Sequence, residues 1–278
     1  MPAAEIEMAE SNVMGVLVRV GGATEGVVAY LGGLAQLTGR ALLLLFTSPL
    51  KRGRSLQRAV HQAMAAGVSA VPIVSLITFF VGLIMALQGA YELKKLGAMQ
   101  MVPALVAVSV SRELGPLITA IVVIGRSGSA FAAEIATMRV TEELDALSTM
   151  ALDPVAFLVA PKFIAMAIML PCLTVWADFM GVLGGCSFGL AGGGFSLISY
   201  FVHTRNALVL SDVLTGIVKS FVFGLIITAV GCQEGFSTGA GAEEVGRSTT
   251  SAVVISILMV ILVDVVFTAL FYLTGGLT

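Results

Sequence analysis

Residues 68–87 read VSAVPIVSLITFFVGLIMAL, a run of 20 residues that contains no charged side chain. An α-helix rises about 1.5 Å per residue, so about 20 apolar residues cross the roughly 30 Å hydrocarbon core of a bilayer. The apolar residues run continuously and do not alternate with polar ones, which argues against a strand of a membrane barrel. This run therefore predicts a membrane-spanning helix.

The whole chain shares this apolar character. Its 278 residues are 58% hydrophobic and only 12% charged, with a mean hydropathy of +1.01. Soluble domains carry about 25% charged residues, so this chain has too little polar surface for a globule in water. Further apolar stretches predict spans at about 101–124, 163–188, 210–232 and 251–272. We therefore expect an all-α polytopic membrane protein with five spans, and the net charge of −2 indicates no nucleic-acid partner.

The N-terminal region is predicted in two parts. Residues 1–24 are polar and form a lead-in, and residues 25–278 form a single membrane domain. Residues 25–46 are apolar and rich in glycine, but their last run, ALLLLF, is too short to span a bilayer. We expect residues 25–46 to lie in the membrane interface as a helix.

The distribution of basic residues predicts the orientation of the spans, because cytoplasmic loops carry an excess of lysine and arginine. With a cytoplasmic N-terminus, three basic residues lie outside: Lys94, Lys95 and Arg205. Ten then lie on the inner side: Arg19, Arg40, Lys51, Arg52, Arg54, Arg58, Arg126, Arg139, Lys162 and Arg247. This orientation places residues 125–154 and 233–250 in the cytoplasm and the C-terminus on the outer side.

Between the second and third spans lies a charge-rich segment, GRSGSAFAAEIATMRVTEELDALSTMALDP (125–154). Its first five residues are small or polar and predict a turn out of the second span. A helix is expected next, because four apolar residues recur on one helical face: Val140, Leu144, Leu147 and Ala151. Arg139 lies three and four residues before Glu142 and Glu143, the spacing at which side chains on a helix pair. Asp153-Pro154 is expected to end the helix. Both a connecting helix and a docking helix fit this pattern.

Several charged residues fall inside the predicted spans, among them Arg112, Glu113, Asp178, Lys219 and Asp264. An unpaired charge at the bilayer centre costs about 2.5–3.5 kcal/mol, so such side chains face the protein interior or a wet cavity. Arg112 and Glu113 are adjacent and point about 100° apart on a helix, so they are not expected to pair with each other. We expect Lys219 to neutralise Asp178 or Asp264. The alternative is that these charges line a route for a polar headgroup.

Other residue types indicate neither a catalytic nor a metal site. The cysteines Cys172, Cys186 and Cys232 lie in apolar stretches without CxxC spacing and are expected to be buried hydrophobes. His61 and His203 fall on opposite sides of the predicted topology, so no metal pair is expected. Glycines at three- to four-residue spacing predict close helix packing, with a hinge as the alternative: Gly181, Gly184, Gly185 and Gly189.

Two long motifs carry a resemblance to a known family. Residues 112–165 read RELGPLITAIVVIGRSGSAFAAEIATMRVTEELDALSTMALDPVAFLVAPKFIA, and they resemble the signature region of the MlaE/YrbE permease family. GCQEGF (231–236) and GAEEVGRSTTSAVV (241–254) are similar to the second cytoplasmic loop of that family. The resemblance covers essentially all of residues 50–275 and none of the first 25 residues.

The resemblance implies a non-enzymatic permease subunit of an ABC transporter for phospholipids or related lipids in a bacterial inner membrane. The implied partners are a second copy of the chain, two ATPase subunits and a periplasmic MCE-domain protein. A small accessory cytoplasmic protein is an optional further partner. No cofactor is expected on this chain. ATP and magnesium are expected on the ATPase, since the GxxxxGK[ST] phosphate loop is absent here.

The resemblance also implies roles for individual residues. The family's coupling helix, which docks on the ATPase, corresponds to about residues 134–150, with polar candidates Glu134, Arg139, Glu142, Glu143 and Asp145. The family's lipid cavity lies near the first span and the charged part of the second, which implies four lipid-path candidates: Gln88, Tyr91, Arg112 and Glu113. For Gln88 and Tyr91, an ordinary interfacial position is the alternative.

Two other function classes are weighed against this one. In a stand-alone ion-coupled secondary transporter, Asp178, Lys219 and Asp264 would form an ion relay. Such transporters often contain inverted repeats, whereas this sequence shows no repeat between its halves and five spans do not divide evenly. A membrane lipid enzyme would need a clustered acidic or histidine-rich motif at a membrane face, and the sequence contains none.

Overall fold

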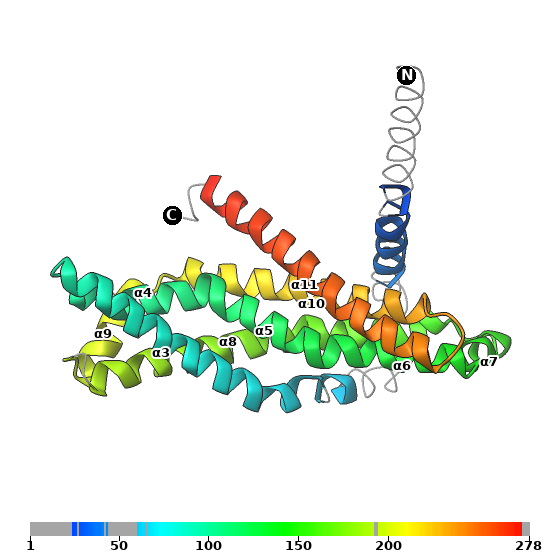
Figure 1. Ribbon diagram of the computed structural model, residues 1–278, viewed down its shortest axis with the longest axis horizontal. Helices are drawn as coiled ribbons and strands as arrows, with labels where there is room; N and C mark the ends of the chain where they lie inside the picture. Colours follow the sequence, from blue (N-terminus) through cyan, green and yellow to red (C-terminus); the bar gives the residue numbers. More distant parts are fainter. Residues whose placement is uncertain are drawn as a thin grey trace, which may run out of the picture.

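The computed structural model describes residues 24–26, 28–41, 43, 60–64, 66–191 and 194–273. Within these residues the secondary structure is helical, and no strand is formed. Residues 1–23 of the polar lead-in, the whole basic block at residues 51–58 and the last five residues lie outside the described part of the chain. Figure 1 shows an elongated helical bundle with α7 at one end and α9 at the other. We call these the α7 end and the α9 end.

Among the described residues, five helices are long and apolar enough to cross a membrane: Val60–Lys95, Met99–Val140, Val155–Leu190, Leu210–Phe236 and Ala242–Leu273. The predicted all-α polytopic membrane protein with five spans is therefore confirmed. The helices are longer than the predicted spans because each continues past its apolar core into charged sequence. A helix keeps its backbone hydrogen bonds within itself, so it can leave the bilayer without unfolding.

The first two spans are built from α3 (Val71–Lys95), α4 (Val102–Ser109), α5 (Gly115–Val123) and α6 (Ser129–Val140). The helix continues beyond the predicted span at residues 68–87, because α3 remains helical to Lys95. The Glu92 carboxylate lies 3.2 Å from the Lys95 ammonium one turn later, and that ammonium lies 4.0 Å from the centre of the Tyr91 ring. These contacts support the last helical turn in water.

The second span is continuous, in contrast to the predicted turn at residues 125–129. Two π-helical turns, Val110–Leu114 and Ile124–Gly128, join α4, α5 and α6 instead. Pro116 has no backbone N–H, and a π-helical turn shifts the hydrogen-bond register so that the helix continues past it. At the second π-helical turn, the Ser129 hydroxyl donates to the Gly125 carbonyl at 2.7 Å.

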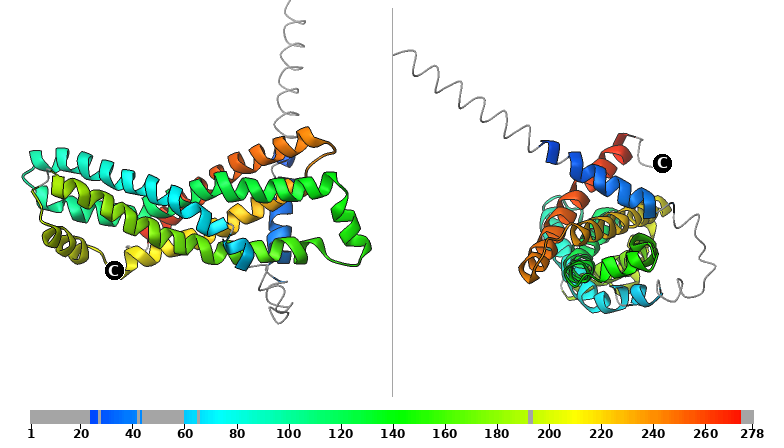
Figure 2. Two further views of the ribbon diagram at one scale, coloured as in Figure 1. Left: turned by 90° about the horizontal axis from the view of Figure 1, so that it is seen from below. Right: turned by 90° about the vertical axis from the view of Figure 1, so that its right-hand side faces the viewer.

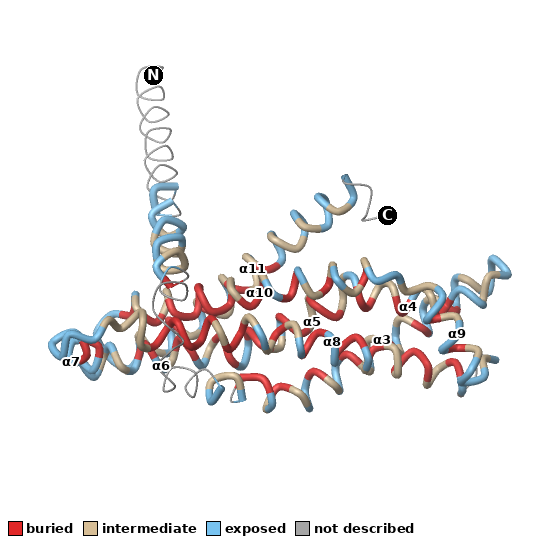
Figure 3. The backbone as a smooth tube through the Cα atoms, turned by 180° about the vertical axis from the view of Figure 1, so that it is seen from behind, coloured by how far each residue is buried: buried red, intermediate tan, exposed pale blue. Residues whose placement is uncertain are grey.

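The remaining elements are α7 (Glu143–Thr149), α8 (Ala160–Ala191), α9 (Leu197–Ala207), α10 (Leu210–Phe236) and α11 (Ala242–Leu273). A π-helical turn, Val155–Val159, leads directly into α8. The C-terminal half of α11 diverges from the bundle, and α11 is the least buried of the five spans (Figures 1 and 3). Its exposed apolar face therefore contacts lipid or another protein chain.

Close contact between α3 and α8 depends on glycine. A Cβ atom added at Gly82 would overlap the backbone of Gly181, and one added at Gly184 would overlap the carbonyl of Phe79. Small residues let two helix backbones approach closely in a membrane, where apolar burial gives no driving force between helices. Outside this seam, the Trp176 indole donates to the Ser75 hydroxyl at 2.7 Å and links the same two helices.

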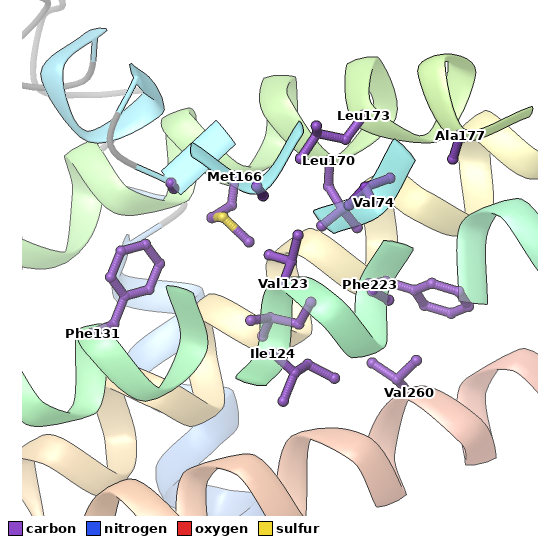
Figure 4. Close-up of a cluster of buried hydrophobic side chains, with 14 residues drawn as sticks. Val74, Val123, Ile124, Phe131, Met166, Leu170, Leu173, Ala177, Phe223 and Val260 are labelled. Atoms are coloured by element: carbon purple, nitrogen blue, oxygen red, sulfur yellow. The ribbon is translucent and has the colours of Figure 1, made fainter. Parts of the chain in front are cut away.

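Side chains from all five spans meet in the middle of the bundle (Figure 4). Val74 comes from α3, Val123 from α5, Leu170 from α8, Phe223 from α10 and Val260 from α11, and all five are buried. The core is therefore shared by every span. Each helix is held in place by packing against several others.

The N-terminal helix, residues 28–41, crosses the bundle near the α7 end (Figures 1 and 2). Leu34, Leu37 and Ala41 pack into a second apolar cluster with residues of α6, α7, α8 and α10. The Arg40 guanidinium lies 3.1 Å from the Asp153 carboxylate, so this helix is also tied to the start of the third span. Its predicted position in the membrane interface stays a prediction.

Replacing Gly184 with valine should destabilise the protein by about 1–3 kcal/mol or more, because the added side chain forces α3 away from α8. Thermal unfolding of the purified protein in detergent measures this change. Gly246→Ala on α11 is the matched control, since a Cβ at Gly246 meets no atom within 4 Å. Equal unfolding midpoints for the two variants would contradict the close packing described here.

Candidate functional site

The segment between the second and third spans consists of two short helical pieces joined at Glu142. This residue has φ of 60°, in the left-handed region, and Ala151 after α7 has φ of 56°. The single helix predicted through Val140 and Ala151 is therefore wrong. The change of direction at Glu142 leaves only Leu144 and Leu147 of the predicted stripe buried, because the stripe requires one uninterrupted helix.

The buried side chains of α7 anchor it to the spans. Leu144 and Leu147 belong to the second apolar cluster, together with Ile135 of α6, Phe163 of α8 and Cys232 of α10. The Asp153 carboxylate accepts a hydrogen bond from the backbone N–H of Val155 at 3.0 Å. Asp153-Pro154 therefore starts the third span, whereas we expected it to end the preceding helix. An N-terminal carboxylate satisfies backbone donors that lack helical partners.

The structure separates the five coupling candidates into two groups. Glu142, Glu143 and Asp145 are exposed at the α7 end. Arg139 and Glu134 contact other parts of the chain: the Arg139 Nε donates to the Thr238 carbonyl at 2.9 Å, and Glu134 Oε2 lies 2.8 Å from Lys162 Nζ. The predicted helical pairing of Arg139 with Glu142 and Glu143 is not formed among the described residues, because the chain turns between them.

The sequence predicts Lys162 only as one of the basic residues on the inner side, whereas the structure buries it. Its side chain is 1% exposed, and its ammonium lies 5.2 Å from the centre of the Phe131 ring. A buried ammonium needs a nearby negative charge, which Glu134 of α6 supplies. The position of Lys162, one residue after Pro161 at the start of an apolar run, was the available signal for burial.

The charged residues of the spans gather around Lys219. Its ammonium is fully buried and lies 2.5 Å from Glu113 Oε2 and 2.9 Å from Asp264 Oδ1. It also donates to the Thr268 hydroxyl at 2.9 Å, and that hydroxyl donates to Glu113 Oε1 at 3.1 Å. We call Glu113, Lys219, Asp264 and Thr268 the Lys219 cluster. It joins the second, fourth and fifth spans.

Arg112 pairs with Asp212, which the sequence analysis did not identify. Arg112 Nε lies 2.5 Å from Asp212 Oδ1, and the Asp212 side chain is only 2% exposed. Asp212 Oδ2 also accepts the backbone N–H of Val209 at 3.2 Å, so the carboxylate caps α10. An aspartate in the first turn of a helix is a known capping signal, and it could have indicated this position.

The geometry explains why Arg112 and Glu113 have different partners. Asp212 and Lys219 are seven residues apart on α10, so they lie on the same face about 10 Å apart. Arg112 and Glu113 are adjacent on the π-helical turn and diverge to reach these two points. The side chains of Arg112 and Glu113 are 49% and 37% exposed, whereas those of Asp212 and Lys219 are buried. The second span therefore presents the accessible charges, and α10 holds them in position.

Asp178 does not join the Lys219 cluster. It is buried beside Gly115, where an added Cβ would overlap its Oδ1 atom, and Oδ1 has no hydrogen-bond partner among the described residues. The expected pairing of Lys219 is therefore found with Asp264 and not with Asp178. The three charges that an ion relay would need are not brought together.

The other lipid-path candidates lie elsewhere on the surface. Gln88 and Tyr91 are exposed near the C-terminal end of α3. Within the described part of the chain, neither forms a hydrogen bond or ion pair with Arg112 or Glu113. Their predicted contribution to a lipid path stays a prediction.

Lys219→Met should lower the free energy of unfolding by about 3–5 kcal/mol, because two carboxylates then lose their counter-charge. Adding Glu113→Gln and Asp264→Asn should restore most of the loss, since neutral amides do not require an ammonium. Thermal unfolding midpoints of the single and triple variants measure this rescue. A triple variant no more stable than Lys219→Met would show that the charges are not coupled as described.

Comparison of this chain with known proteins identifies its family. Residues 59–270 match the family model described as permease MlaE. A probable ABC transporter permease protein of Rickettsia prowazekii is 39% identical over 229 residues, which cover 82% of this chain and 88% of that protein. The chloroplastic protein trigalactosyldiacylglycerol 1 of Arabidopsis thaliana is 36% identical over 220 residues, or 79% of this chain and 63% of that protein.

A third relative has a name that specifies a lipid. The intermembrane phospholipid transport system permease protein MlaE of Haemophilus influenzae is 34% identical over 217 residues, which cover 78% of this chain and 83% of that protein. The family model, over residues 59–270, covers the first four spans, most of the fifth, the π-helical turns and α7. The chain belongs to the MlaE permease family.

Proposed function

We propose that this chain is the permease subunit of an ABC transporter that moves phospholipids or related lipids. In this proposal the lipids pass between a bacterial inner membrane and a periplasmic MCE-domain protein, and a separate ATPase supplies the energy. Membership of the family and the phospholipid transport system named for the Haemophilus relative support the lipid substrate. The excess of basic residues on one side supports a cytoplasmic N-terminus and a periplasmic C-terminus.

The main support for the proposal is that α7 has one buried apolar side and one exposed acidic side. Its apolar side, through Leu144 and Leu147, is fixed in the same cluster as the spans, and Glu142, Glu143 and Asp145 are exposed on the other side. A helix of this kind can transmit a movement from a docked subunit to the spans. We assign α7 and the end of α6 as the docking site for the ATPase, with one ATPase on each chain of a permease homodimer.

The Lys219 cluster and Arg112 are proposed to form part of the lipid route. A phospholipid headgroup carries charge, and a charge in the membrane requires polar partners. Arg112 and Glu113 offer one accessible guanidinium and one accessible carboxylate, held from behind by Asp212 and Lys219. The ATPase is expected to hold ATP and magnesium, and a small accessory cytoplasmic protein is a further proposed partner.

Copurification tests the subunit assignment. The full complex should contain the ATPase and the MCE-domain protein, and lipid transfer by the reconstituted complex should require ATP. Movement of lipid by this chain alone, in liposomes with an ion gradient and no ATP, would overturn the proposal.

Replacing both Glu142 and Asp145 with lysine should reduce ATPase assembly or ATP turnover by about tenfold, the effect of losing about 1.4 kcal/mol of binding free energy. Insertion into the membrane should be unchanged, because both side chains are exposed. Glu92→Lys at the α9 end is the control for an exposed acidic residue. ATP turnover that is unchanged in the double variant would argue against docking at α7.

Replacing Glu113 with glutamine should slow lipid transfer more than it lowers assembly. The amide keeps a hydrogen-bond acceptor for Lys219, and Asp264 still neutralises that ammonium, but the accessible negative charge is lost. Lipid transfer and subunit content are measured on the same preparation. A variant that assembles in lower yield, but in which each assembled complex transfers lipid at the normal rate, would indicate a packing role alone.

A further inference from the structure

Two adjoining cavities lie between the start of the first long helix and the start of α8. The first is a niche of about 210 Å³ that has four polar or charged side chains in a mainly apolar lining: His61, Gln62, Glu134 and Lys162, together with Phe157, Leu158 and Pro161. The second is an apolar groove of about 290 Å³, whose larger lining side chains are Val60, Met64, Val68, Ile164, Ile168 and Met169. Neither cavity contains residues of the Lys219 cluster.

The niche and the groove share the same two helices: on the first long helix His61 and Gln62 line the niche in the same turn as Val60, Ala63 and Met64 of the groove, whereas on α8 the niche precedes the groove. On α8 and the turn before it, the niche involves residues 157–162 and the groove residues 164–169. Successive helical residues rise 1.5 Å, so along this helix the lining changes from one that includes the charged Lys162 to one that is wholly apolar within about 10 Å. A bilayer shows the same change from headgroups to acyl chains over a similar depth.

The groove is a concave surface on two membrane-spanning helices. Val60, Met64, Val68 and Ile168 are each about half exposed there, which leaves apolar side chains open to the bilayer. A Cβ at Gly67 would overlap the Met169 side chain, so the glycine lets Met169 lie flat against the helix and keeps the groove open. An acyl chain is the occupant that matches an apolar groove at this depth.

The accessible charge in the niche points to a particular headgroup. Lys162 is buried, whereas the Glu134 side chain is 43% exposed, and only its Oε2 atom contacts Lys162. Glu134 Oε1 can therefore accept a hydrogen bond from an ammonium group. His61 is exposed and Gln62 is half-buried on the facing helix, and both can donate to a phosphate.

We propose that this niche and groove bind one phospholipid of the cytoplasmic leaflet whose headgroup carries a primary ammonium, such as phosphatidylethanolamine. Glu134 accepts from the ammonium, His61 and Gln62 donate to the phosphate, and one acyl chain lies in the groove. The site is separate from the Lys219 cluster and lies at the α7 end, next to the segment that we assign to ATPase docking. The inference rests on the proposed function for the orientation of the chain and for its contact with lipid.

Photo-cross-linking from within the groove tests the occupant. p-Benzoylphenylalanine replaces Ile168, and in a matched control it replaces Val175, which lies two turns further on the same face of α8 and outside the groove. Both side chains are exposed, by 58% and 47% respectively. The full chain is placed in nanodiscs of equal parts phosphatidylethanolamine and phosphatidylglycerol, and mass spectrometry identifies each adduct.

Position 168 should capture phosphatidylethanolamine about tenfold more often than phosphatidylglycerol, as expected when one hydrogen bond to a charged group discriminates between them. Position 175 should capture the two lipids in proportion to their abundance. Equal capture at position 168, or a cross-link to residues 44–59 of the same chain in place of lipid, would overturn the proposal.

Two further variants separate the groove from the niche. Ala63→Trp fills the groove and should lower lipid capture at position 168 about tenfold, the effect of about 1.4 kcal/mol of binding free energy. Glu134→Gln with Lys162→Met removes both charges of the pair together, which avoids leaving an unpaired buried ammonium. This double variant should keep lipid capture but lose the headgroup preference. A preference that persists would exclude Glu134 as its source.

ATP-driven lipid transfer by the unmodified complex is measured in parallel. Transfer without selective capture at position 168 would overturn this site and leave the proposed function standing. Selective capture without ATP-driven transfer would uphold the site and overturn the proposed function.

Discussion

The buried ammonium of Lys219 is the constraint on which the arrangement of the spans depends. A charge in a low-dielectric interior is tolerated only when counter-charges lie against it, and breaking such a pair costs several kcal/mol. Glu113 comes from the second span and Asp264 from the fifth, at 2.5 Å and 2.9 Å from the Lys219 ammonium. The cluster therefore fixes the register of three helices, while apolar packing between membrane helices is less specific.

The π-helical turn at Val110–Leu114 makes this arrangement possible and links it to the proposed lipid route. It carries the chain past Pro116 without a break and presents Arg112 and Glu113 in diverging directions toward α10. Each then has a buried partner and an accessible side. The Arg112–Asp212 and Glu113–Lys219 pairs therefore combine two roles. They hold α10 against the second span, and they orient the two charged side chains that a headgroup would meet.

At the α7 end, one apolar cluster gathers the N-terminal helix, α6, α7, α8 and α10. A displacement of α7 by a docked subunit would act on all of them, because the interior is closely packed and transmits strain. The pair of buried Lys162 and exposed Glu134 lies beside this cluster and lines the niche. The proposed docking surface and the proposed phospholipid site are therefore connected through the same helices.

The sequence by itself determined the class of the protein and its five spans, because a helix satisfies its own backbone hydrogen bonds in hydrocarbon and the length of each apolar run is visible in the chain. Its long motifs also indicated the family. It also identified Lys219, Asp264 and the charged pair of the second span as residues that need partners. Only the tertiary structure decided that Lys219 contacts Glu113 and Asp264 but not Asp178, and that Arg112 contacts Asp212. These partners lie about 100 residues apart in some cases, and local periodicity carries no information on which helix faces meet.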